Sequence, residues 1–221
     1  MPGRGAEGAR QGGVTHQDSS AIRLIISDFG GVICTYDYNI FCRRLARRAG
    51  RAPEEIHAAA FDPWLQQEFE TGAVSGREFH HVVMARLRLD IPYDEFVPMY
   101  GDIFTPIAAT CSLLRTLHVT YPLYLLSDTN EIHFGYVLET QPVLRLFAER
   151  ILSCEVRARK PDPAMYSEAL RRSRLPAESC VFVDDRSANV EGAKRAGMPA
   201  IQFKSTEQMA MDLRRLGVRV P

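Results

Sequence analysis

Acidic residues follow three apolar runs of the sequence, a placement that could support metal-dependent chemistry. Asp28 follows the first run, and the pair Asp184 and Asp185 follows the last. Carboxylates held close together repel one another unless they are protonated or bind a cation. Hard oxygen ligands of this kind suit Mg²⁺, which commonly binds one or two carboxylates, water and a substrate phosphate. If the runs are neighbouring strands, these three acids predict a magnesium site.

Residues near the same acids could hold an anionic substrate. Gly30 and Gly31 let the backbone approach a ligand and present N–H groups to an anion. Ser127, after the second run, offers a hydroxyl and neighbouring amides to a phosphate oxygen, and Lys160 offers a point positive charge. Asp28 is then left facing phosphorus as a nucleophile, and carboxylates do form aspartyl-phosphate intermediates.

The apolar runs themselves are typical of buried parallel strands, because they are short, apolar and stopped by polar or glycine residues. We expect strands at residues 22–26, 123–126, 151–154, 181–183 and 200–203. Helical patterns lie between them, at residues 110–118, 131–147, 164–172, 188–196 and 206–216. Strands alternating with helices predict an α/β fold with a Rossmann-like, doubly wound parallel sheet, whose ligand site lies at the carboxyl ends of the strands.

The segment 36–105 breaks this alternation, since it contains helical stretches and no convincing strand. We expect helices at residues 39–49, 53–60, 63–70, 76–87 and 93–104. We interpret this segment as a helical cap inserted into an α/β core formed by residues 21–35 and 106–221. Residues 1–20 are rich in glycine, and we expect a flexible tail without chemistry there.

The motifs, taken in order, resemble those of the haloacid dehalogenase superfamily, a large group of mostly magnesium-dependent phosphatases. The first motif is similar to the sequence Asp-Phe-Gly-Gly-Val that begins at Asp28, and the second to Ser127. The third motif resembles Lys160, and the fourth the pair Asp184–Asp185. The likeness covers residues 22–203, and the inserted segment occupies the position of the helical cap in this superfamily.

The resemblance implies a role for each of these residues. Asp28 would be the nucleophile, while Ser127, Asp128 and Lys160 would bind phosphate, Lys160 also acting in catalysis. Mg²⁺ would be held by Asp28, the Gly30 carbonyl and Asp185, with Asp184 orienting these ligands. Within the cap, the pattern Glu-x-Glu-x-Gly-x-Val-Ser at 68–75 resembles a bacterial subgroup of sugar-phosphate phosphatases, including those acting on glucose 1-phosphate.

Two positions depart from the superfamily pattern. Most of its phosphatases carry a second Asp, two residues after the nucleophile, as general acid and base, and here Gly30 stands at that position. The substitutes that we consider are Tyr36, Asp37, His80 and His81, although each is more simply a cap or hinge residue. Asp128 stands where relatives often have Asn, and we expect its side chain to turn toward the loop while its backbone N–H binds phosphate.

Composition narrows the class of protein and its partners. The chain has 221 residues, 46% hydrophobic and 24% charged, which is typical of a soluble globular protein. Its 27 Lys and Arg residues balance 27 Asp and Glu residues, which argues against a nucleic-acid partner. No run approaches the roughly 18–20 apolar residues of a membrane span. Five dispersed cysteines without a C-x-x-C pair argue against disulfides or zinc and favour the cytoplasm.

We therefore expect a cytoplasmic, Mg²⁺-dependent phosphoric monoester hydrolase, either monomer or homodimer, that acts on a small phosphorylated metabolite, with sugar phosphates among the candidates. One alternative is a 2-haloacid dehalogenase, which needs no metal. The pair Asp184–Asp185 disfavours it, because two further anions would repel a carboxylate substrate. Another alternative is a non-catalytic binding or regulatory protein, which Gly30 and Asp128 suggest.

Overall fold

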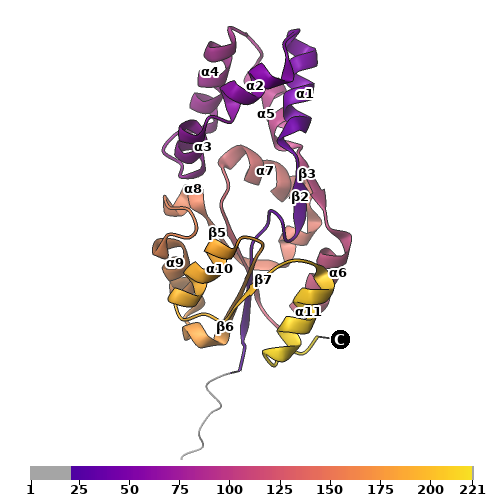
Figure 1. Cartoon of the computed structure of the whole chain (residues 1–221), viewed down its shortest axis with the longest axis vertical. Helices are drawn as coiled ribbons and strands as arrows, with labels where there is room; N and C mark the ends of the chain where they lie inside the picture. The colour runs from indigo at the N-terminus through magenta and orange to yellow at the C-terminus, as the bar shows by residue number, and fades with distance from the viewer. Residues whose placement is uncertain (1–20, 221) are drawn as a thin grey trace, which may run out of the picture.

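A parallel five-stranded sheet forms the centre of the lower part of the molecule in Figure 1. The computed structural model describes residues 21–220, so the predicted tail at 1–20 lies outside the described residues. The strand order is β5–β4–β1–β6–β7, and all four pairs are parallel. The strands are β1 (Leu24–Ser27), β4 (Leu123–Ser127), β5 (Phe147–Leu152), β6 (Cys180–Asp184) and β7 (Ala200–Gln202). The predicted α/β fold is confirmed.

Helices cover both faces of this sheet, as the apolar runs require. On one face, Ile25 packs in a cluster with residues of α6 (Ala108–His118), α7 (Glu131–Thr140) and α11 (Thr206–Arg215). Leu24 and Ile26 point the other way, because successive side chains of a strand alternate. They pack with residues of α9 (Pro163–Ser173) and α10 (Ser187–Arg195). All three strand residues are at most 1% exposed, so β1 is buried on both faces.

The helical cap lies above the sheet and has a hydrophobic core of its own (Figure 1). Its helices are α1 (Tyr38–Ala49), α2 (Pro53–Ala60), α3 (Pro63–Glu70), α4 (Gly76–Leu87) and α5 (Tyr93–Gly101). Phe41, Phe96 and Tyr100 pack ring against ring at the centre, with centroid distances of 5.1–5.6 Å. Such aromatic pairs add to the stabilisation from burial alone. The expected inserted helical cap is therefore present.

Two short strands join the cap to the core, and the sequence did not predict them. β2 (Cys34–Tyr36) and β3 (Phe104–Pro106) pair antiparallel, with Tyr36 opposite Phe104. The expected helix over 93–104 therefore ends early, at Gly101. Three-residue strands are too short to give a readable alternation. The division at residues 36 and 105 falls inside these strands and stays a prediction.

The prediction was wrong in the segment after Glu131. We expected one helix over residues 131–147, but α7 ends at Thr140. A 3-10 turn, η1 (Pro142–Leu146), follows, and β5 begins at Phe147, four residues before the expected strand. Pro142 has no N–H for a helical hydrogen bond, which explains the end of the helix. The residues after Leu152 form a short helix, α8 (Ser153–Val156).

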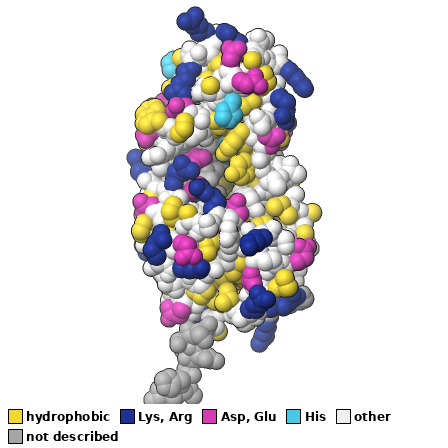
Figure 2. Space-filling model, viewed as in Figure 1, with side chains coloured by type: hydrophobic (Ala, Val, Ile, Leu, Met, Phe, Trp, Pro, Cys, Tyr) yellow, Lys and Arg dark blue, Asp and Glu magenta, His cyan; other side chains and the backbone are white. Residues whose placement is uncertain are grey.

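The surface shows no large region of a single charge on the face drawn in Figure 2. Lys and Arg side chains are interspersed there with Asp and Glu, in line with the net charge of zero. Among residues 21–220, no helix combines the length and the apolar character needed to cross a membrane.

Candidate active site

The carboxyl ends of three neighbouring strands bring the predicted acids together. β1 lies between β4 and β6, and its last residue, Ser27, pairs with Leu125 on one side and Val183 on the other. Asp28 follows β1, and Asp184 ends β6. Asp28, Asp184 and Asp185 each offer one carboxylate oxygen, and these oxygens lie within 4.8 Å of one another. Parallel register thus collects residues that are more than 150 positions apart in the sequence.

Lys160 lies at the centre of this acidic group with all three of its N–H bonds engaged. Its Nζ lies 2.9 Å from Asp28 Oδ1 and donates to Asp184 Oδ2 at 2.8 Å and to the Leu126 carbonyl at 2.8 Å. The residue is 4% exposed. Burial alone would lower the pKa of Lys160, but Asp28 and Asp184 raise it above its usual range, so the ammonium stays charged. A buried ammonium bonded in this way fixes both carboxylates.

The adjacent residues Asp184 and Asp185 differ in every contact. Asp184 is fully buried, and both its oxygens accept two hydrogen bonds, from Lys160, the Arg186 N–H and the Asn189 amide. Asp185 is half-buried, and its carboxylate bonds to no other residue in the described chain. It lies against Gly31, where φ is +76° and a Cβ would collide with it. Asp184 therefore holds the site together, and Asp185 remains available to a ligand.

Asp28 has one oxygen held and one free. Its Oδ1 accepts from the Phe29 N–H at 2.7 Å and contacts Lys160, whereas its Oδ2 has no partner within residues 21–220. Burial raises the pKa of Asp28, Lys160 opposes the rise, and Asp184 adds to it. The ion pair fixes the direction of the free oxygen, which faces the cavity that Asp28 lines.

These residues fit a hard divalent cation. The carboxylates of Asp28 and Asp185 keep bonding capacity within the cluster, and Gly30 lies in the loop between β1 and β2, lining the same cavity. Asp184 already accepts four hydrogen bonds, which suits a residue that supports ligands. Oxygen donors at such a spacing match Mg²⁺.

The second strand end supplies Ser127 and Asp128, and Asp128 turns away from the acidic group. Its Oδ1 accepts from the backbone N–H of Lys160 at 2.9 Å, so the side chain points to the loop that carries Lys160, as expected. Burial raises the pKa of Asp128, and Lys160 opposes this. Ser127 lies at the cavity, with its hydroxyl 3.5 Å from the Asp128 carbonyl, a weak contact that a ligand could replace.

The position that lacks a second Asp is covered by an aromatic ring. A Cβ built on Gly30 would lie 3.1 Å from Tyr36 Cε1, so the Tyr36 ring occupies the space over this residue. Gly30 has no left-handed backbone; Gly31 is the residue that requires one. Of the other substitutes, Asp37 caps the N-terminus of α1, and His80 bonds the Ile91 carbonyl within the cap. Neither these two nor His81 lines the cavity.

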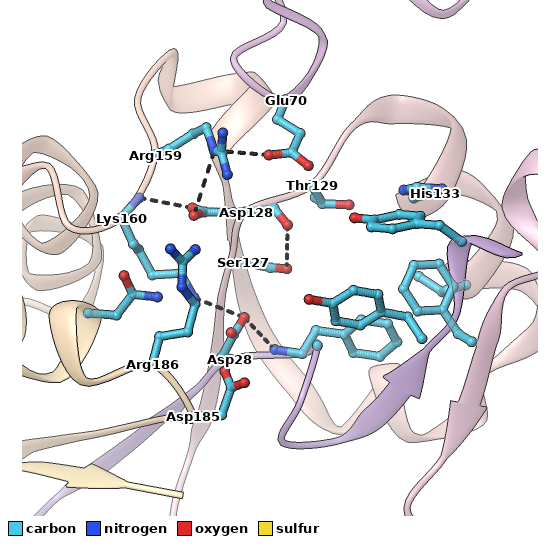
Figure 3. Close-up of a pocket in the computed structure, with 17 residues that line it drawn as sticks. Asp28, Glu70, Ser127, Asp128, Thr129, His133, Arg159, Lys160, Asp185 and Arg186 are labelled. Atoms are coloured by element: carbon cyan, nitrogen blue, oxygen red, sulfur yellow. Dashed lines mark hydrogen bonds and ion pairs between the residues drawn. The ribbon is translucent and has the colours of Figure 1, made fainter. Parts of the chain in front are cut away.

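Two cavity residues were not singled out from the sequence. Glu70, the last residue of α3, is 9% exposed, and Arg159 precedes Lys160 in the loop before α9. Arg159 Nε lies 2.9 Å from Glu70 Oε2 and 3.9 Å from Asp128 Oδ2, as Figure 3 shows. The available signals were the position of Glu70 in the 68–75 pattern and of Arg159 beside the lysine. Neither signal says that cap and core meet here.

The cavity between cap and core has a volume of about 110 Å³. Acids and bases line one part of it, and Tyr36, Tyr38 and Phe104 line another. Lys160 and Asp28 lie deep in the cavity, whereas Arg186 at its mouth is exposed. The space suits a phosphate group with a small organic group attached.

The comparison that decides the family is a match over most of the chain. A family model described as haloacid dehalogenase-like hydrolase matches residues 22–197. The chain belongs to this family. The predicted superfamily and the prediction of a hydrolase are confirmed.

Similar proteins add phosphatases and a magnesium-bound structure. The D-ribitol-5-phosphate phosphatase of Bacteroides thetaiotaomicron is 24% identical over 82% of this chain and 91% of its own length. Flavin mononucleotide hydrolase 1 of Arabidopsis thaliana is 38% identical over 68 residues, only 28% of that protein. A Bacteroides thetaiotaomicron enzyme of the family, solved with magnesium and inorganic phosphate, superposes with a TM-score of 0.74 at 21% identity, covering 83% of this chain and 95% of its own. The expected class, a hydrolase of phosphoric monoesters, agrees with these relatives.

Proposed function

We propose that this chain is a Mg²⁺-dependent phosphatase that hydrolyses a small phosphomonoester through an aspartyl-phosphate on Asp28. The observation that carries the proposal is the geometry of Asp28: one oxygen is bonded to Lys160 and the Phe29 amide, and the other is free toward the cavity. A carboxylate held in this way is oriented for attack before substrate binds, which removes part of the entropic barrier.

The reaction has two steps. One carboxylate oxygen of Asp28 attacks phosphorus while the other is left for the metal, the bond to the leaving oxygen breaks, and that oxygen takes up a proton. Water then attacks phosphorus, the bond to Asp28 breaks, and inorganic phosphate leaves. Asp28, Asp185 and the Gly30 carbonyl would hold Mg²⁺, which would neutralise charge on the phosphate oxygens. Ser127, the Asp128 amide and Lys160 bind the same oxygens, so that catalysis comes mainly from positioning and electrostatics.

Tyr36 is the proton donor that we propose for the leaving oxygen. His133 does not fit this role, because both its ring nitrogens are bonded and burial lowers its pKa to about 3. The Tyr36 hydroxyl has no bonded partner among the described residues, and its ring covers Gly30. It would donate its proton as the leaving oxygen departs and recover one from the water that attacks in the second step.

The substrate that we propose is a small phosphorylated metabolite, with sugar phosphates as the leading class. The D-ribitol-5-phosphate phosphatase and the 6-phosphogluconate phosphatase among the relatives support this choice. All five cysteines are free thiols, in keeping with a cytoplasmic enzyme.

The test is hydrolysis of p-nitrophenyl phosphate with and without Mg²⁺. We expect phosphate release that requires the metal and that disappears in Asp28→Asn. Chloride release from 2-chloropropionate without metal would instead indicate a dehalogenase. Magnesium and phosphate binding without turnover of any phosphomonoester would indicate a binding protein.

A further inference from the structure

Three buried polar atoms on the cap-facing wall of the cavity have no hydrogen-bond partner within residues 21–220. They are Oε2 of Glu70, Oδ2 of Asp128 and Nε of Arg159. All three residues line the cavity, and they come from the end of α3, the end of β4 and the loop before α9. Glu70 as a whole is 91% buried. Buried polar atoms are nearly always bonded in proteins, whereas these three have only one another, in ion pairs.

The contacts between the three atoms are ionic and incomplete. Arg159 Nε lies 2.9 Å from Glu70 and 3.9 Å from Asp128, but neither approach has hydrogen-bond geometry. One guanidinium thus faces two carboxylates. These three atoms are themselves inaccessible, but the side chains of Arg159, Glu70 and Asp128 remain 33%, 12% and 13% exposed and line the cavity, so their other polar atoms can bond a ligand. The carboxylates need donors and the guanidinium needs an acceptor. A hydroxyl group is both, and an alkyl chain is neither.

We propose that Glu70, Asp128 and Arg159 form a subsite for neighbouring hydroxyl groups on the leaving alcohol of the substrate. Because this assignment names the leaving group of the proposed phosphatase reaction, it rests on the proposed function. The assigned ligand is a short polyol phosphate or a phosphate of one small sugar, because such a leaving alcohol carries neighbouring hydroxyls.

The aromatic part of the lining suits the same ligand. The Tyr36 ring packs at a tilt against Tyr38, with a centroid distance of 5.4 Å, and against Phe104, at 6.3 Å; Tyr38 lies 6.4 Å from His133. In Figure 3, His133 lies across the cavity from Arg159. A carbon chain with hydroxyls along one side can place its C–H groups on the rings and its hydroxyls on the charged groups. An entirely apolar leaving group would offer these charged side chains neither a donor nor an acceptor.

Cap and core both contribute to this subsite. Glu70 belongs to the cap, Arg159 and Asp128 to the core, and the Ser153 hydroxyl of the core donates to the Glu70 carbonyl at 2.6 Å. A ligand that bonds Glu70 and Arg159 at once therefore bridges the two parts, which links recognition of the hydroxyls to closure of the cap.

The experiment compares glycerol 1-phosphate with propyl phosphate, which share a three-carbon primary leaving alcohol but differ in two hydroxyls. We expect wild type to favour glycerol 1-phosphate. Glu70→Gln and Arg159→Lys are expected to lower kcat/KM for glycerol 1-phosphate by about 10–100-fold, mainly through KM, because a bond to a charged group is lost. The effect on propyl phosphate should be below about 2-fold.

Glu95→Gln is the matched control, because Glu95 pairs with Arg48 on the cap surface and does not line the cavity. It should leave both substrates unchanged. Thermal unfolding checks that each variant folds. Equal losses on both phosphates, or no loss on glycerol 1-phosphate in a folded Glu70→Gln, would overturn the subsite.

A binding measurement separates the subsite from the proposed function. Asp28→Asn is titrated calorimetrically with both phosphates in the presence of Mg²⁺, with and without Glu70→Gln. Tighter, Glu70-dependent binding of glycerol 1-phosphate supports the subsite even if wild type shows no turnover, which would reject the phosphatase alone. Turnover of propyl phosphate without any preference for glycerol 1-phosphate would reject the subsite alone.

Discussion

The floor of the cavity, where Lys160 and Asp184 lie, and its cap-facing wall, where Glu70 and Arg159 lie, differ in how fully their polar groups are hydrogen-bonded. On the floor, every N–H of Lys160 and both oxygens of Asp184 are bonded within the protein. On the wall, Glu70 and Arg159 touch without hydrogen bonds. A bonded floor keeps reacting groups in one geometry, which favours catalysis. The polar side chains of the wall can instead bond the ligand. Substitutions in the wall can therefore change substrate specificity without disturbing the floor.

The largest expected effect comes from Asp28 on the floor. Asp28→Asn replaces the attacking carboxylate with a poorly nucleophilic amide of the same size. We expect turnover of p-nitrophenyl phosphate to fall by more than about 10⁴-fold, as loss of a covalent nucleophile usually does. Circular dichroism should show an intact fold, and beryllium fluoride should bind wild type but not the variant. Turnover at the wild-type rate would remove Asp28 as nucleophile.

The next effect sharpens the contrast between two adjacent acids. Asp184→Asn leaves Lys160 short of a buried anionic partner, and we expect a loss of about 3–5 kcal/mol in the free energy of unfolding. Asp185→Asn is the matched control and should unfold close to wild type in urea, because no other described residue bonds to its carboxylate. Equal destabilisation by both substitutions would contradict the division between supporting and ligand-facing acid.

For Mg²⁺ affinity the order should be the opposite, with a larger effect from Asp185→Asn than from Asp184→Asn. Asp185→Asn removes the negative charge of a direct ligand, so we expect Mg²⁺ affinity to fall by more than about 100-fold, beyond the cost of losing an outer supporting group. Calorimetric titration of Mg²⁺ measures this without turnover. Unchanged affinity in Asp185→Asn would make Asp184 the better ligand candidate.

The smallest effect depends on the leaving group. Tyr36→Phe should slow hydrolysis of propyl phosphate by about 10²-fold, the lower end for general acid catalysis, and hardly change that of p-nitrophenyl phosphate, whose leaving oxygen needs no proton. Tyr38→Phe is the control, since it removes a hydroxyl from the same aromatic lining. The measurement is kcat/KM across phosphates of graded leaving-group pKa. A slope unchanged by Tyr36→Phe would exclude it as the donor.

The floor was predictable from the sequence and the wall was not. Asp28, Asp184 and Ser127 each follow an apolar run, and parallel strands must bring such positions to one edge. Glu70 contacts Arg159 because of the orientation in which the cap packs on the core, and no local sequence pattern predicts that orientation. That Asp184 accepts four hydrogen bonds could not be predicted either, since its partners are Lys160 in the loop before α9 and two residues at the start of α10.

The secondary structure, too, was predicted well where local sequence signals decide it and poorly where distant contacts do. Helices with clear start signals were predicted closely: α2 and α3 begin at a Pro, α4 follows a Ser, and all three begin and end where expected. A single helix was wrongly expected over residues 131–147, because the apolar residues of this segment suit a helix as well as a buried strand. Only Pro142 signalled the break, and β5 then gains its hydrogen bonds from β4, a neighbour that sequence periodicity does not reveal.

Because β1 lies at the centre of the sheet, the cap can fold before the sheet is complete. The cap helices contact one another within residues 38–101, whereas β1 needs β4 and β6, the latter more than 150 residues later in the chain. Local contacts form faster than distant ones. We expect the cap to gain protection from hydrogen exchange before the sheet does, and pulse labelling during refolding would reveal the order. The active-site residues at the strand ends would then come together beneath a cap that has already folded.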